Sequence, residues 1–101
     1  MQPESRKEYS AAWNQLRAEA ERLRIQFVDA DLGIAMTFLR IASTACHNGE
    51  TDEANRLIAR AEHASHKVAE FLDRISEGPA GPLREKLATL DAAIAEAKKA
   101  L

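Results

Sequence analysis

Apolar residues recur at alternating spacings of four and three along most of this chain, and this heptad rhythm is the feature that most constrains its fold. Such spacing places apolar residues on one stripe of an α-helix, which buries that stripe against neighbouring helices. The pattern predicts an all-α fold in which the first stripe, anchored by two aromatic residues, faces the core. That stripe consists of Tyr9, Trp13, Leu16, Ala20, Leu23 and Phe27.

Residues that end or begin helices separate the stripes and predict a four-helix antiparallel bundle of helical hairpins. Asn48-Gly49 supplies a left-handed C-cap, Thr51 supplies an N-cap, and residues 77–82 form a Gly/Pro hinge before a terminal helix. The first break depends only on Asp29 or Asp31 as a cap, so one long helix over residues 5–47 stays an alternative. The expected helices span residues 5–28, 31–48, 51–76 and 83–100.

Length and charge predict one small domain that neither spans a membrane nor binds nucleic acid. The chain has 101 residues and a net charge of -2, with acidic and basic residues mixed along every segment. The lone Cys46 cannot form an intrachain disulfide, the N-terminus has no apolar signal segment, and residues 32–46 are too short to span a bilayer. We therefore expect a soluble protein of the reducing cytoplasm.

Few residues in the chain suit chemistry. His63 and His66 lie one helical turn apart, a spacing at which two imidazoles can share a metal ion. Both lie away from the apolar stripe of their helix, where water would surround a bound ion, so we expect no metal site. The chain also has no His-Glu-x-x-His motif, paired Cys or Gly-rich phosphate loop, and we expect no cofactor.

The segment Gly49-Glu50-Thr51-Asp52-Glu53-Ala54, with Ala61 seven residues later and the aromatic Phe38 before it, resembles a tetratricopeptide (TPR) unit. The resemblance implies a TPR-like central hairpin, a helix pair joined by a turn that contains Gly. Ile41 and Ala42 stand where that family has its Leu-Gly pair, so Ala42 departs from the pattern, and His66 replaces the Pro that ends the unit. No second unit follows, which argues against a stacked solenoid.

The segment Arg60-Ala-Glu-His-Ala-Ser-His66 is similar to the Arg-x(4–6)-His motif of HEPN ribonucleases, small helical bundles that usually act as dimers. The resemblance implies His66 as the general acid or base and Arg60 as the partner of the phosphate or transition state. Arg56 and His63 fit the same spacing. Ala61 stands where the family has a polar residue. The alternative function is therefore a metal-independent ribonuclease that acts as a dimer.

The preferred hypothesis is a noncatalytic protein-interaction or assembly module whose first expected partner is itself. The heptad stripe of the first helix and the thinly apolar terminal helix leave apolar surface that a homodimer would cover. The polar strip of residues 37–47 could form the floor of a partner groove. The candidate interface residues are Thr37, Arg40, Thr44, Leu87 and Leu90.

Overall fold

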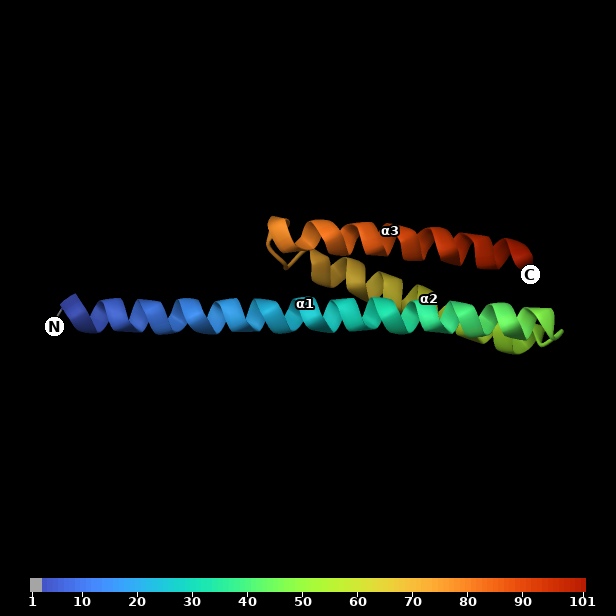
Figure 1. Cartoon of the computed structure of the whole chain (residues 1–101), viewed down its shortest axis with the longest axis horizontal. Coiled ribbons are helices and arrows are strands. Elements are labelled where there is room, and N and C mark those ends of the chain that lie inside the picture. The colour runs from blue at the N-terminus through green and yellow to red at the C-terminus, as the bar shows by residue number, and fades with distance from the viewer. Residues whose placement is uncertain (1–2) are drawn as a thin grey trace.

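Three α-helices make up the fold. The structure is a computed structural model that describes residues 3–101, with side chains from residue 9 onward. Helix α1 spans Pro3–His47, α2 spans Thr51–Leu72 and α3 spans Glu77–Ala100. Helices α1 and α2 form an antiparallel hairpin, and α3 returns along both of them (Figure 1). The all-α prediction is confirmed, whereas the prediction of four helices is wrong.

Helix α1 runs unbroken through residues 28–33, where a turn was the preferred prediction. Val28 and Leu32 are buried on one stripe that continues across this segment. Asp29 caps no new helix, because α1 is continuous there, and its carboxylate forms an ion pair with Lys86 of α3. Packing against α3 therefore favours a straight helix, and the alternative of one long helix describes α1.

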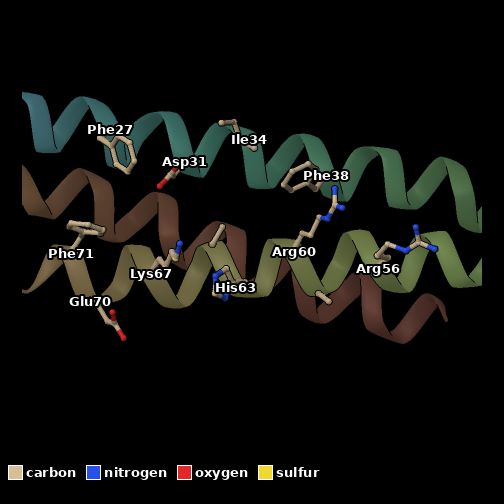
Figure 2. A pocket seen from close by; sticks show the side chains of 12 residues that line it. Phe27, Asp31, Ile34, Phe38, Arg56, Arg60, His63, Lys67, Glu70 and Phe71 are labelled. Atoms are coloured by element: carbon tan, nitrogen blue, oxygen red, sulfur yellow. The ribbon is translucent and has the colours of Figure 1, made fainter.

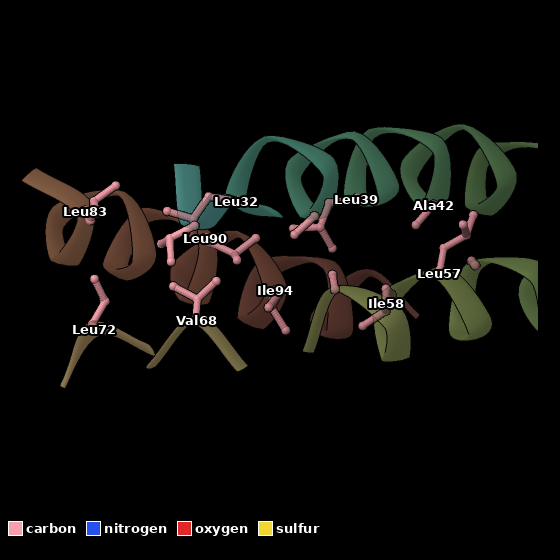
Figure 3. Packing of buried hydrophobic residues seen from close by; sticks show 14 of the residues in the cluster. Leu32, Leu39, Ala42, Leu57, Ile58, Val68, Leu72, Leu83, Leu90 and Ile94 are labelled. Carbon is pink, nitrogen blue, oxygen red and sulfur yellow. The ribbon is translucent and has the colours of Figure 1, made fainter. Parts of the chain in front are cut away.

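The core lies between α2, α3 and the C-terminal half of α1 (Figure 3). Leu72 and Val68 of α2, Leu90 of α3 and Val28 of α1 are its largest fully buried side chains. One stripe of α2 is buried against the other two helices, and its small residues Ala54 and Ala61 allow the helices to approach closely. The buried members of that stripe within α2 are Ala54, Leu57, Ile58, Ala61, Ser65, Val68 and Leu72.

The turn between α1 and α2 has the predicted left-handed cap. Gly49 adopts a positive φ of 78°, which Gly tolerates without steric cost. The Gly49 amide donates to the Cys46 carbonyl at 3.1 Å, and the Glu50 amide donates to the Ala45 carbonyl at 2.8 Å. These two hydrogen bonds form a Schellman motif that satisfies the last carbonyls of α1. The N-cap of α2 is Glu50, one residue before the predicted Thr51.

The Gly/Pro segment 77–82 begins α3. Ser76 is the N-cap, and the Ala80 amide donates to the Ser76 carbonyl at 3.1 Å. Pro79 falls in the first turn, where backbone N–H groups have no partner within the helix, so its missing N–H costs no hydrogen bond there. The predicted start of this helix at residue 83 is thus six residues late, and α2 ends at Leu72 instead of residue 76.

A carboxylate of α1 contacts the N-cap residue of α3. The Ser76 amide donates to Glu21 Oε1 at 2.8 Å, a contact between residues 55 positions apart. Hydrogen bonds from the Ser76 side chain and then from its amide lower the pKa of Glu21, and the charge of Arg24 adds to this effect. A lowered pKa in the folded state means that ionised Glu21 stabilises the fold above the ordinary pKa of a Glu side chain.

We expect Glu21→Gln to lower the melting temperature slightly at pH 7. The difference from the unmodified chain should shrink as the pH falls below the ordinary Glu pKa towards about 3, because protonation removes the same charge. Circular dichroism melts at both pH values measure this. Glu19→Gln is the matched control, since Glu19 pairs only with Arg22 on the surface of α1. A pH-independent difference for Glu21→Gln would contradict the assignment.

The molecule is elongated because α1 is far longer than its partners. Its principal extents are 71, 19 and 15 Å, and its radius of gyration is 19.2 Å, whereas a compact domain of this size has about 13 Å. Helices α2 and α3 lie only along the C-terminal half of α1, and the N-terminal half extends beyond them (Figure 1). Residues 9–19 of α1 are all exposed, and the first contacts with the rest of the described chain are those of Glu21 with Ser76 and of Ile25 with the core.

Candidate protein-interaction surface

Helix α1 carries an exposed apolar stripe along most of its length. Seven of the eight exposed large apolar side chains among the described residues lie on α1, from Tyr9 at 72% exposed to Ile41 at 49%. All seven fall on one series of alternating four- and three-residue steps, which continues the stripe of residues 9–27. We call this series the α1 seam: Tyr9, Trp13, Leu16, Ala20, Leu23, Phe27, Ala30, Ile34, Thr37, Ile41 and Thr44.

The seam overturns the prediction that Tyr9 and Trp13 anchor the core. Tyr9 is 72% exposed and Trp13 is 59% exposed, although both lie on a stripe whose heptad spacing is typical of buried helix faces. Two physical reasons combine: α2 with 22 residues and α3 with 24 are too short to reach along the 45 residues of α1. Where they do lie beside α1, they pack on the neighbouring stripe and leave Ile34 and Ile41 of the seam exposed. The stripe of residues 9–27 is real, but no helix of the same chain covers it.

A second apolar stripe runs beside the seam in the C-terminal half of α1. This core stripe starts one residue after Phe27 and faces α2 and α3, so it is buried where the seam is open. The apolar residues of this segment therefore divide into a buried and an exposed set, since Ile34 and Ile41 are exposed. The buried members are Val28, Leu32, Ala35, Leu39, Ala42 and Ala45.

A groove of about 830 Å³ lies between the seam and α2 (Figure 2). Its α1 wall consists of Phe27, Asp31, Ile34 and Phe38, and its α2 wall runs from Arg56 to Phe71. At one end Phe27 meets Phe71 edge to face with ring centroids 6.3 Å apart. The residues that α2 contributes are Arg56, Ala59, Arg60, His63, Ala64, Lys67, Glu70 and Phe71.

Charged side chains line the edges of this apolar groove. The Arg60 guanidinium lies 6.0 Å from the centroid of the Phe38 ring, a cation–π geometry. Figure 2 shows Lys67 and His63 on α2, with Asp31 on the α1 side. The rings of Phe38 and Phe71 are only partly buried and form part of the apolar surface of the groove. An apolar floor between charged edges suits an amphipathic helix better than a small polar substrate.

Three of the predicted interface residues lie on or beside the seam. Thr37 and Thr44 are exposed seam members, and their hydroxyls donate to the carbonyls of Gly33 at 3.0 Å and Arg40 at 3.3 Å. Because their own helix satisfies these hydroxyls, the two Thr side chains do not need polar partners at an interface. Arg40 is exposed next to the seam.

The two predicted interface residues of the terminal helix lie differently. Leu90 is 0% exposed and belongs to the core, and Leu87 is partly buried against it. Helix α3 packs on both α1 and α2, so it is part of the bundle and not a loosely docked helix. Leu90 is therefore not available to a partner of the folded chain.

The candidate catalytic and metal residues do not converge. Arg60 and His66 are six residues apart, which places them about 120° apart around the axis of α2. His63 lines the groove together with Arg56, two turns before it. Within the described part of the chain, no group of three His, Cys, Asp or Glu side chains could hold a metal ion.

Sequence analysis missed the groove and one polar contact in the core. The buried Ser65 hydroxyl donates to the carboxylate of Asp91 and links α2 to α3. A Ser within an apolar stripe is a signal for such a contact, but its partner on another helix cannot be identified from spacing. The groove was not predicted, because its α1 wall runs from Phe27 to Phe38, across the segment where a break between two helices was expected.

Comparisons with protein-family models, with curated proteins and with solved structures found no match to this chain. None of the three helices, over the residues that the structure describes, is long and apolar enough to cross a membrane. The geometry of the α1 seam and its groove is therefore the basis for a functional assignment.

Proposed function

We propose that this chain is a noncatalytic protein-interaction module that docks a helix along the α1 seam. The observation that carries the proposal is the series of seven exposed large apolar side chains from Tyr9 to Ile41. A heptad seam of this kind pairs with a second helix by knobs-into-holes packing. Contiguous exposed apolar surface of this extent is typical of interaction sites and uncommon on monomers.

The magnitude of the hydrophobic effect supports the proposal. Full burial of one large apolar side chain contributes about 1.5–3 kcal/mol, so burying the exposed half of seven such side chains contributes roughly 5–10 kcal/mol per chain. Association costs about 4–15 kcal/mol in lost translational and rotational freedom. The seam, with a complementary apolar stripe on its partner, can therefore drive stable association.

The ribonuclease alternative has weaker support and stays a prediction. Its two residues, Arg60 and His66, lie on different sides of α2. Arg60 already contacts the Phe38 ring. The TPR resemblance is compatible with an interaction module, although it concerns only the hairpin between α1 and α2.

Site-specific photocrosslinking in the producing cell tests the proposal. A benzophenone amino acid at the seam residue Leu16 should form covalent protein adducts, because a docked helix would cover that position. The same group at Ala18, which points to the opposite face of the same turn, is the matched control and should form none. Mass spectrometry identifies the adducts. Equal yields at both positions, or none at either, would refute the helix-docking function.

A further inference from the structure

We infer that the helix docked on the α1 seam is the N-terminal half of α1 from a second copy of this chain, in antiparallel orientation. Each copy would then fill the groove of the other. The inference rests on the proposed function, because it names the partner of the same seam.

The shape of the molecule favours an antiparallel arrangement. Residues 9–19 of α1 form a single uncovered helix, whereas the C-terminal half of α1 carries α2 and α3 (Figure 1). Antiparallel pairing lays each slender N-terminal half against α1 and α2 of the partner, in the groove of about 830 Å³. Parallel pairing would bring two three-helix ends together and leave each N-terminal half with one neighbour only.

The distribution of large and small residues defines the register. In the proposed register, the residue numbers of two facing residues, one in each copy, add up to 50. The twofold axis then passes beside Ile25, the middle residue of Pro3–His47. The large seam residues then pair with one another, and the bulky Trp13 meets a small Thr. The resulting layers are Tyr9 with the partner's Ile41, Leu16 with the partner's Ile34, Leu23 with the partner's Phe27, and Trp13 with the partner's Thr37.

Parallel pairing would stack identical residues and pack less evenly. Trp13 would face its own copy in one layer and Ala20 would face its own copy two layers on, giving an overfilled layer and an underfilled one. Charge agrees with the antiparallel register. Arg17, Arg24 and Asp31 follow one flank of the seam at heptad spacing. Antiparallel pairing places Arg17 beside the partner's Asp31 twice in each dimer and Arg24 beside the partner's Arg24 once, so opposite-charge pairs outnumber the like-charge pair.

This arrangement would restore the four-helix bundle that the heptad pattern predicts. The fourth helix of each bundle, residues 9–24, would come from the other copy. Such an exchange needs no change in the three helices of either chain, because the groove is already open. The groove is thus incomplete without the second copy.

Disulfide trapping tests the inference with chains in which Cys46, the only native Cys, is replaced by Ser. Leu16→Cys and Ile34→Cys are placed in separate chains, one of them with an affinity tag, and the two are mixed and oxidised. We expect the mixed disulfide to exceed either symmetric disulfide at least tenfold. In the antiparallel register the two copies of position 16 lie about 27 Å apart, beyond the reach of a disulfide.

Three other outcomes would overturn the inference. A dominant symmetric disulfide of Leu16→Cys would show parallel pairing, and preferential pairing of Leu16→Cys with Ile41→Cys would show a register shifted by one heptad. Absence of every disulfide, together with photocrosslinked adducts that contain other proteins, would leave the helix-docking function intact with a different partner. Both positions are exposed in one chain, 60% for Leu16 and 52% for Ile34, so the variants should fold.

Discussion

Leu90→Ala should lower the free energy of unfolding by about 2–5 kcal/mol, because it opens a cavity at the centre of the three-helix core. Leu90 is 0% exposed and packs among buried residues of all three helices. Chemical denaturation followed by circular dichroism, at one fixed protein concentration, measures the loss.

Leu101→Ala serves as the matched control at the end of the same chain. Leu101 is 44% exposed, so its truncation should cost no more than about 0.5 kcal/mol. If both variants lost the same stability, Leu90 would not occupy the core. The result also bears on the interface hypothesis, since a substitution that unfolds the chain cannot serve as a test of docking.

Features set by local sequence were predictable. The spacing of apolar residues predicted helices along the chain, and Asn48-Gly49 predicted the turn with positive φ at Gly49. Both depend on residues within a few positions of one another, where helix geometry and steric limits act directly. The all-α class follows from the same local signals.

Features set by distant contacts were not predictable. The straight course of α1 is supported by Asp29 with Lys86 and by Glu21 with Ser76, pairs separated by more than fifty positions. An Asp without Gly or Pro beside it is compatible with a cap or with a helix interior, so local sequence left the choice open. The groove depends on that choice.

The misplacement of Trp13 has a different physical reason. A heptad pattern indicates that a stripe favours burial against a helix, but the spacing is the same whether that helix belongs to the same chain or to another. Here α2 and α3 are each about half as long as α1, and they pack on the stripe beside the seam, which leaves even Ile34 and Ile41 exposed. The same stripe that predicted a core therefore supports an interface.

Leu16→Asp combined with Leu23→Asp should weaken self-association by at least a hundredfold. Both residues are exposed in one chain, at 60% and 65%, so the double variant should keep its helical signal and its core. In the proposed pair both side chains would be enclosed, and desolvating unpaired carboxylates is costly. Sedimentation velocity over a range of concentrations measures the change.

Ala11→Asp combined with Ala18→Asp is the matched control for that double variant. It adds the same charge to the same segment of α1, on the face away from the seam. We expect its self-association to match that of the unmodified chain within a few fold. Equal weakening by both double variants would indicate a general effect of charge and would remove the seam from the interface.

The molar mass of the unmodified chain in solution tests the central claim most directly. Sedimentation equilibrium at micromolar concentrations should give twice the 11.1 kDa of one chain. The mass should stay the same in high salt, because salt screens exposed charges but does not weaken apolar contacts. A mass of 11.1 kDa at every concentration up to the high micromolar range would contradict self-association through the α1 seam.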